Sequence, residues 1–324
     1  MDFRSLFEKN KVVVAPMAGI TNAAFREILQ VYEPALIYSE MVSDKAINYR
    51  NDKTLEMLRV NPGENSVVLQ LFGGEAETIA PATQYVSQHT NAVMIDLNAG
   101  CPVSKVVKAG SGSSLMEKPQ TLADMIHSMR DRSDVPISVK IRSGYDSKKN
   151  APQIARIAED AGASLITVHG RTRSQMYKGK VDLDIIKAVK EAVNIPVIGN
   201  GDITSPEEAK AMIDYTGVDA VMVGRALRTS PWLIKQINDY LLTGTYTGSA
   251  TNDARLDTVL EHARKLIALK GEAIAMLEMR THAPAYLKGM PGATVIKREL
   301  VGIETFDAFQ HIIESYRSDL QRSK

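Results

Sequence analysis

The chain contains little cysteine, few aromatic residues and no long apolar run. One cysteine in 324 residues excludes an intrachain disulfide and a cysteine-rich metal site, so we expect a reducing, cytoplasmic compartment. Residues 1–10 lack the apolar core of a signal peptide, and no segment is long enough to suggest a membrane span. The formal net charge is only +1, so a protein of this composition that binds RNA must gather positive charge locally.

The single cysteine, Cys101, stands in an unusual place. It follows the apolar run 92–97, lies between Gly100 and Pro102, and is followed closely by Lys105. An inert cysteine usually stands among apolar neighbours in a strand or helix. A thiol in a basic loop at the end of a strand is placed to meet a ligand. The local sequence leaves two readings open, a chemical role and an inert thiol in a surface turn.

Eight apolar segments rich in valine and isoleucine predict parallel strands that are covered on both faces. They span residues 11–19, 35–42, 66–73, 92–100, 136–144, 164–171, 195–202 and 220–226. Helical segments lie between them, and Ser205, Pro206 and Glu208 have the spacing of a capping box. The pattern predicts a (β/α)8 TIM barrel within residues 1–242. A doubly wound open sheet is the alternative, although the first turn lacks the G-x-G-x-x-G that such a sheet usually carries.

Polar residues collect where the predicted strands end. In a barrel these ends form one rim, which is where active sites are built. Contributions from six or more strands are hard to explain by stability alone. The rim residues are Met17, Gln70, Asn98, Lys140, Arg142, His169, Arg171, Asn200, Asp202 and Arg225.

The turns after the last two strands have the composition of a phosphate site. Gly201 and Gly224 allow backbone amides to approach a phosphate closely, and Arg225 adds charge-assisted hydrogen bonds. Two tight turns that simply need glycine are the alternative.

The C-terminal part of the chain has a different sequence pattern from the predicted barrel. Residues 243–253 have the composition of a linker, and residues 254–324 show helical periodicity. We therefore predict a small all-α domain after the barrel. Its charges are mixed, but Lys288 lies among basic residues that would form a local basic edge.

Taken together, these segments resemble the tRNA-dihydrouridine synthase family, and most closely its bacterial B-type branch. The similar segments run from Ala15 to about Leu227 and include A-P-M-A-G-I-T-N, V-V-L-Q-L-F-G, I-D-L-N-A-G-C-P, V-K-I-R-S-G, I-T-V-H-G-R-T-R, I-P-V-I-G-N-G-D-I and V-M-V-G-R-A-L. The C-terminal similarity is looser. The resemblance implies that residues 254–324 bind tRNA.

The resemblance also implies an oxidoreductase that holds flavin mononucleotide, FMN, at the rim and takes electrons from NADPH. Gln70 would face the pyrimidine edge of the flavin, and the Lys140 ammonium would stabilise its reduced form. No metal and no obligate protein partner are implied. The cofactor-binding residues carried over from the family are Pro16, Met17, Ala18, Gln70, Lys140, His169, Asn200, Gly201, Asp202, Gly224 and Arg225.

The implied reaction reduces the 5,6 double bond of uridine in tRNA. Reduced flavin gives a hydride to carbon 6, and Cys101 gives a proton to carbon 5. A thiol of ordinary pKa, about 8.5, is mostly protonated at neutral pH, which suits an acid. The uridine must leave its stack to reach the rim. The expected tRNA contacts are Asn98, Lys105, Arg142, Arg171, Arg173 and Lys288.

Two other functions stay open at this level. A flavoprotein similar to dihydroorotate dehydrogenase performs related pyrimidine chemistry on a free metabolite and needs no C-terminal helical domain. A non-catalytic RNA-binding module that kept the barrel is the second alternative, although binding alone needs neither Cys101 nor Lys140.

Overall fold

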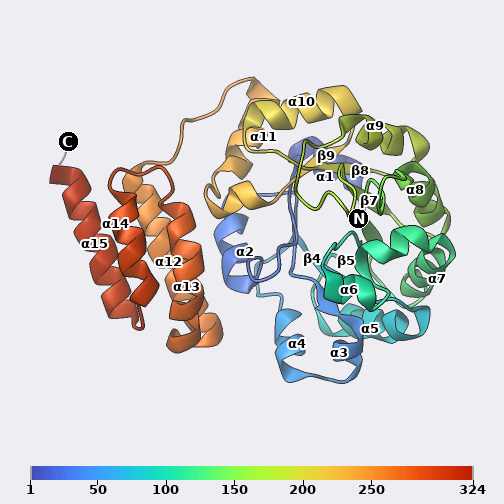
Figure 1. The fold of residues 1–324 in the computed structure, drawn as a ribbon, viewed down its shortest axis with the longest axis horizontal. Helices are drawn as coiled ribbons and strands as arrows, with labels where there is room; N and C mark the ends of the chain where they lie inside the picture. The colour runs from blue at the N-terminus through green and yellow to red at the C-terminus, as the bar shows by residue number, and fades with distance from the viewer. Residues whose placement is uncertain (1, 323–324) are drawn as a thin grey trace.

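The computed structural model describes residues 2–322 and contains a closed barrel of parallel strands followed by a bundle of helices (Figure 1). Strand β2 pairs with β1 on one side and with β4 on the other, which closes the ring. The predicted TIM barrel is confirmed, and the open doubly wound sheet is wrong. Around the barrel the order is β1 (Val12–Val14), β2 (Leu36–Tyr38), β4 (Val67–Phe72), β5 (Met94–Ala99), β6 (Ile137–Arg142), β7 (Leu165–His169), β8 (Val197–Asn200) and β9 (Ala220–Val223).

The second predicted strand is divided into two pieces. It forms β2 and then β3 (Val42–Ser43), which pairs with the far end of β4. At the break, the Ser39 hydroxyl accepts the backbone N–H of Gln70 at 3.1 Å and donates to the Glu40 carbonyl at 2.8 Å. The Ser39 side-chain oxygen thus accepts a hydrogen bond that a main-chain carbonyl would accept in a regular sheet. The regular pairing of β2 with β4 stops there.

Helices cover the outside of the barrel, as the alternating pattern predicts. The Ser205 hydroxyl accepts the backbone N–H of Glu208 at 3.2 Å, and the Glu208 carboxylate accepts the backbone N–H of Ser205 at 3.1 Å. This confirms the predicted capping box, which contributes on the order of 1 kcal/mol to helix stability. The outer helices are α2 (Ala23–Gln30), α5 (Ala76–His89), α7 (Pro119–Arg130), α8 (Ala151–Asp160), α9 (Leu183–Ala192), α10 (Pro206–Thr216) and α11 (Leu233–Thr243).

Shorter elements close the barrel and build its loops. Phe3 and Phe7 of α1 pack against apolar side chains inside the barrel, such as Val13 and Met94, and so close its lower end. Above this apolar floor lie buried polar side chains, because every second strand residue points inward. The short elements are α1 (Phe3–Lys9), α3 (Asp44–Asn48), α4 (Asp52–Met57), α6 (Ser104–Lys108) and the 3₁₀ helices η1 (Gly112–Glu117) and η2 (Arg225–Arg228).

Four helices and one short 3₁₀ turn follow the barrel and lie beside α2, far from α8 and α9 (Figure 1). Residues 244–251 form no helix between α11 and the first of them. The separation into a barrel, a linker and a helical domain stays a prediction about independent folding. The C-terminal elements are α12 (Asn252–Lys270), α13 (Glu272–Tyr286), α14 (Ala293–Glu299), η3 (Leu300–Gly302) and α15 (Phe306–Arg322).

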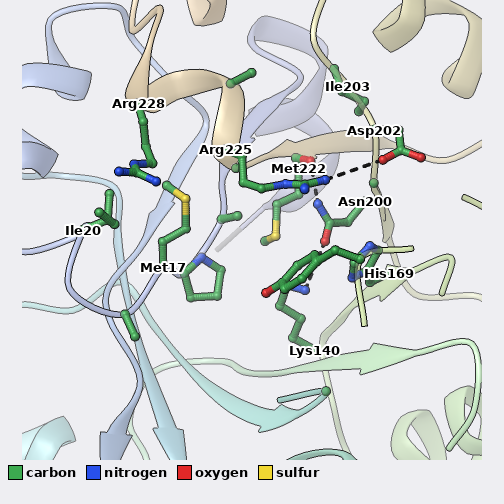
Figure 2. A pocket seen from close by; sticks show the side chains of 18 of the residues that line it. Met17, Ile20, Lys140, His169, Asn200, Asp202, Ile203, Met222, Arg225 and Arg228 are labelled. Carbon is green, nitrogen blue, oxygen red and sulfur yellow. Dashed lines mark hydrogen bonds and ion pairs between the residues drawn. The ribbon is translucent and has the colours of Figure 1, made fainter. Parts of the chain in front are cut away.

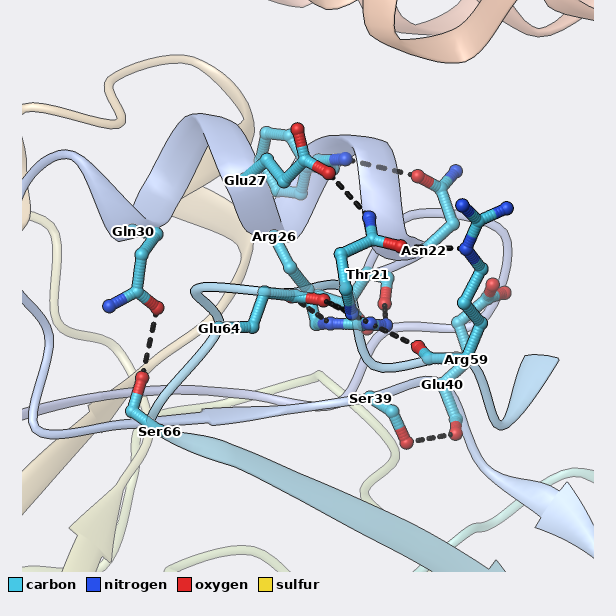
Figure 3. Close-up of polar contacts among 12 residues, drawn as sticks. Thr21, Asn22, Arg26, Glu27, Gln30, Ser39, Glu40, Arg59, Glu64 and Ser66 are labelled. Atoms are coloured by element: carbon cyan, nitrogen blue, oxygen red, sulfur yellow. Dashed lines mark hydrogen bonds and ion pairs between the residues drawn. The ribbon is translucent and has the colours of Figure 1, made fainter. Parts of the chain in front are cut away.

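Helix α2 joins the two parts of the molecule. Its Arg26 donates to the Glu64 carboxylate at 2.9 Å in a buried ion pair, which ties α2 to the barrel (Figure 3). On the side of the helical bundle, Phe25 stacks on His262, with ring centroids 5.3 Å apart. Lys265 of α12 donates to Glu27 at 2.8 Å across the same contact. The bundle is therefore held against α2 by both apolar and charged contacts.

Candidate active site

A cavity of about 880 Å³ opens at the carboxyl ends of the barrel strands. The structure brings together on its lining every residue predicted to act as acid or to hold the cofactor, which agrees with the expected rim. Their individual roles as ligands stay predictions. The predicted residues on the lining are Pro16, Met17, Ala18, Gln70, Asn98, Cys101, Lys140, Arg142, His169, Asn200, Gly201, Asp202, Gly224, Arg225 and Lys288.

A chain of buried hydrogen bonds runs through the barrel to Cys101. The Asp96 carboxylate accepts from Gln70 Nε2 at 2.8 Å, and Gln70 Oε1 accepts from Asn98 Nδ2 at 2.7 Å. Asn98 Oδ1 then accepts the backbone N–H of Cys101 at 2.8 Å. Asp96 is fully buried, which raises the pKa of its carboxyl to about 7 in spite of hydrogen bonds from Ser138 and Gln70. The chain fixes the orientation of both amides.

The loop that carries Cys101 is held against a second turn. The backbone N–H of Ser113 donates to the Cys101 carbonyl at 3.1 Å. Gly112 has a φ of +62°, and a Cβ there would lie 2.9 Å from the Cys101 carbonyl oxygen. Glycine is therefore required for both the backbone angle and the close approach. The thiol is partly buried on the cavity lining.

The electrostatic surroundings of Cys101 favour the neutral thiol. Burial raises the pKa of the Cys101 thiol above its ordinary value, and this outweighs the backbone N–H of Val103 and the charges of Arg142 and Lys140. The thiol is therefore protonated at neutral pH. This is the state that a proton donor needs.

Lys140 and Asn200 form a hydrogen-bonded pair on the lining (Figure 2). Lys140 Nζ donates to Asn200 Oδ1 at 3.1 Å, and Asn200 Nδ2 donates to the Met222 carbonyl at 2.8 Å. Burial, with help from Arg142, lowers the pKa of Lys140 to about 8. Burial also lowers the pKa of His169 strongly, so its ring is neutral among the surrounding cations. This part of the lining thus presents the Lys140 ammonium beside a neutral imidazole.

Arg142 and Arg171 hold loops in place. Arg142 is 3% exposed and donates to the carbonyls of Gly100 at 2.7 Å and Thr172 at 2.9 Å. Arg171 is 2% exposed, does not line the cavity, and donates to Asp202 at 2.6 Å. A direct phosphate contact would compete with these bonds, because both guanidinium groups are already engaged inside the protein. Both side chains thus position loops in this structure, and their contact with tRNA stays a prediction.

Two further predicted tRNA contacts lie outside the cavity. Lys105 is exposed on α6, and Arg173 places its guanidinium 5.2 Å above the ring of Tyr145. A large substrate that extends beyond the cavity can reach both side chains. Their contact with tRNA remains a prediction.

The turns at Gly201 and Gly224 lie on the cavity lining beside Arg225. Gly201 has a φ of +131°, and a Cβ there would lie 2.7 Å from Val181. A Cβ at Gly224 would lie 3.2 Å from the Cβ of Ala15. The Arg225 side chain is 63% exposed and lies 3.7 Å from the Asp202 carboxylate. Packing therefore requires glycine at both turns, and the exposed Arg225 guanidinium beside them suits a phosphate group.

Several side chains on the lining were not predicted from the sequence, among them Tyr177 and Arg228. The exposed ring of Tyr177 lies beneath the guanidinium groups of Arg142, at 5.7 Å, and Arg225, at 5.0 Å. Arg228 lies at the end of η2. Both residues lie in segments that follow predicted strands, and this position in the sequence could have indicated them. Their direction depends on loop conformations that periodicity does not encode.

Comparison with known proteins gives the family. The family model for "Dihydrouridine synthase (Dus)" matches residues 13–321. The chain belongs to the dihydrouridine synthase family. It is 41% identical over 280 residues to "tRNA-dihydrouridine synthase B" of Shewanella oneidensis, covering 86% of this chain and 87% of the relative. The relative of the same name in Vibrio vulnificus is 38% identical over 310 residues, covering 95% of this chain and 96% of that protein.

The match extends through the C-terminal helices. "Probable tRNA-dihydrouridine synthase" of Rickettsia conorii is 37% identical over 323 residues, covering 97% of this chain and 96% of the relative. The resemblance to the dihydrouridine synthases is therefore confirmed, and it favours this family over the dihydroorotate dehydrogenases. Within residues 2–322, no group of three or more potential ligand side chains is arranged to hold a metal ion. None of the helices described has the length and apolar character needed to cross a membrane.

Proposed function

We propose that this protein reduces the 5,6 double bond of uridine in tRNA to give 5,6-dihydrouridine. The observation that carries the proposal is the neutral thiol of Cys101 on the lining of the cavity that also holds Lys140 and the glycine turns. The relatives named as tRNA-dihydrouridine synthases support tRNA as the substrate. The cytoplasmic location expected from the sequence stays a prediction.

The cavity lining fits FMN. Gly201, Gly224 and the exposed Arg225 lie together on the lining, which suits a phosphate, and the buried ammonium of Lys140 suits the anionic edge of a reduced flavin. When bound, reduced FMN supplies the hydride for carbon 6 of the uracil, and NADPH restores its electrons. The residues that would hold it are Pro16, Met17, Ala18, Gln70, Lys140, His169, Asn200, Gly201, Asp202, Gly224 and Arg225.

Cys101 supplies the proton in this proposal. The Sγ–H bond breaks and the proton forms the new bond at carbon 5, so a hydride and a proton together saturate the double bond. A thiolate is left, which Lys140 and Arg142 stabilise electrostatically until it takes a proton from water. The Asn98 hydrogen bond to the Cys101 backbone holds the thiol at the lining during this step. General acid catalysis of this kind contributes about 10²–10⁴ in rate.

The charge distribution suits an extruded nucleotide. Asn98 and Lys288 line the cavity, whereas Lys105 and Arg173 lie outside it and would contact more distant parts of the RNA. Tyr177 offers an exposed ring on the lining, and unstacked bases commonly stack on such rings. A uridine in a tRNA loop costs less to extrude than one in a duplex.

The proposal is tested with a tRNA transcript that lacks dihydrouridine, together with FMN and NADPH. Wild-type protein is expected to form dihydrouridine, and Cys101→Ala is expected to lower the rate by about 10²–10⁴ while flavin absorbance is kept. Cys101→Ser is the matched control for side-chain volume, and because a hydroxyl is a much weaker acid it should be similarly slow. Normal turnover by Cys101→Ala contradicts the role of the thiol. Turnover of free dihydroorotate without any tRNA reaction contradicts the proposed substrate.

A further inference from the structure

Part of the positive charge on the cavity lining has no role in the proposed reaction. Five cations line the cavity against two carboxylates, and the carboxylates already have partners. Asp202 is bound by Arg171, and the Glu208 carboxylate accepts the backbone N–H groups of Thr204 at 2.7 Å and Ser205 at 3.1 Å. The cations are Lys140, Arg142, Arg225, Arg228 and Lys288, and the carboxylates are Asp202 and Glu208.

Arg228 is the arginine of this set whose guanidinium has no partner. Within residues 2–322 it makes no hydrogen bond and no ion pair, and its Nε is shielded from solvent with no acceptor. By contrast, Arg142 donates to the carbonyls of Gly100 and Thr172, and Arg225 faces Asp202. A shielded N–H without an acceptor costs on the order of 1–3 kcal/mol, so it points to an acceptor that a bound molecule supplies.

Arg228 points away from the glycine turn that we assign to the cofactor phosphate. Arg225 and Arg228 both belong to η2, yet Arg225 extends toward Asp202 whereas Arg228 extends toward Met17 (Figure 2). Arg228 also lies close enough to α13 for its charge to lower the pKa of His282. It therefore stands where the barrel meets the helical bundle.

Lys288 reaches the same cavity from the helical bundle. It directly follows the end of α13 at Tyr286 and Leu287, and its side chain is exposed. Arg255 holds this turn by donating to the carbonyls of Tyr286 at 2.6 Å and Lys288 at 2.7 Å. The Lys288 ammonium has no hydrogen-bond or ion-pair partner among the described residues. One unpaired cation from each part of the chain thus faces one cavity.

We propose that Arg228 and Lys288 form a phosphate clamp that binds a backbone phosphodiester of RNA beside the nucleotide that enters the cavity. The inference rests on the proposed function for the identity of the RNA. The phosphate of the flavin is the other phosphate group that these two cations could bind. We assign the clamp to RNA because Lys288 comes from outside the barrel and Arg228 faces away from the Gly201 turn.

The test measures binding of a tRNA transcript at several KCl concentrations for wild type, Arg228→Gln, Lys288→Gln, the double variant and Arg156→Gln. Each phosphate contact contributes about 0.7–0.9 to the slope of log affinity against log salt. The double variant should reduce the slope by about that amount, because both cations bind the same phosphodiester, and Arg228→Gln and Lys288→Gln should each give part of that reduction. Arg156 is an exposed cation on α8, far from the helical bundle, so Arg156→Gln should keep the wild-type slope.

Three further measurements separate the outcomes. FMN titration of Arg228→Gln should give the wild-type affinity, and thermal unfolding should show a folded protein. A salt slope equal to that of Arg156→Gln overturns the clamp, as does weakened FMN binding with an unchanged RNA slope, which would assign Arg228 to the flavin phosphate. Dihydrouridine formation by wild type reports on the proposed function alone, because the salt slopes are measured without turnover.

Discussion

Asn98 accepts the backbone N–H of Cys101 at 2.8 Å, through the same oxygen that accepts the N–H of Gly100 at 3.1 Å. The Asn98 amide is itself oriented by Gln70, and Gln70 by Asp96. A carboxylate on the barrel axis therefore determines where the only thiol of the chain stands.

The pH dependence of Cys101 is accessible because the chain has one thiol. Burial raises the pKa of Cys101, so the thiolate appears at higher pH in the folded protein than in the unfolded chain. We expect the midpoint of the alkylation rate against pH to lie above that of the same protein in urea, where a value of about 8.5 applies. Dihydrouridine formation should decline through the same alkaline range. Equal midpoints in the folded and unfolded protein would show that the thiol is not shielded.

Asp96 should make the free energy of unfolding depend on pH. Its pKa is about 7 in the folded protein against an ordinary 3.8, so between these values the folded protein binds more protons than the unfolded chain. The contribution of Asp96 to the free energy of unfolding therefore falls as pH rises from about 4 to about 7. Asp96→Asn keeps the shape and removes this effect. The variant should gain stability relative to wild type across that range and keep a constant difference above it.

Urea denaturation at several pH values measures the effect of Asp96→Asn. Asp134→Asn is the matched control, because Asp134 is an exposed aspartate. A difference between Asp96→Asn and wild type that does not change with pH would argue that Asp96 is ionised throughout. In that case the carboxylate keeps its charge inside the barrel.

Gly201→Ala should remove cofactor binding. The new Cβ would lie 2.7 Å from Val181, at a φ of +131° that side chains rarely adopt, so we expect a loss of about 1–3 kcal/mol in stability and a protein that purifies with little flavin. Gly217→Ala is the matched control. Gly217 also has a positive φ, +71°, but a Cβ there would have no neighbouring atom within 4 Å. Flavin content and thermal unfolding are measured for both variants, because both carry backbone strain and only Gly201→Ala adds the clash. Full flavin content in Gly201→Ala would show that this turn does not bind the cofactor.

The contact between α2 and the helical bundle should weaken in acid. Burial lowers the pKa of His282 to about 4 from an ordinary 6.5, and the charges of Arg228 and Lys270 add to this. The unfolded chain takes up the proton first as pH falls, so the stability that neutral His282 contributes is lost from about pH 6.5 down to about pH 4. The loss approaches on the order of 3 kcal/mol at the acid end.

His282→Gln should reduce this acid sensitivity, because glutamine takes up no proton. His311→Gln provides a control in the same bundle, since His311 is exposed on α15. Urea denaturation at pH 7.5 and pH 5 compares the variants. Equal losses in wild type and His282→Gln would place the acid-sensitive group elsewhere, with His262 as the next candidate because its ring lies 4.7 Å from that of His282.

Much of this fold follows from local sequence patterns. Parallel strands covered on both faces appear as continuous apolar runs, and polar residues at their ends lie on one rim because all the strands point the same way. The capping box at Ser205 is equally local. The division of the second strand was not predictable, because it depends on the Ser39 hydroxyl meeting the backbone N–H of Gln70, 31 residues away.

The sequence by itself determined the barrel, the position of Cys101 at a strand end and most of the predicted rim residues, since these depend on periodicity and strand direction. Only the tertiary structure decided which cations are free. Arg142 and Arg228 are indistinguishable as residue types near strand ends, yet Arg142 meets the carbonyl of Thr172, brought to it by another loop, and Arg228 meets none. Whether the fold supplies an acceptor to a guanidinium depends on segments that are distant in sequence.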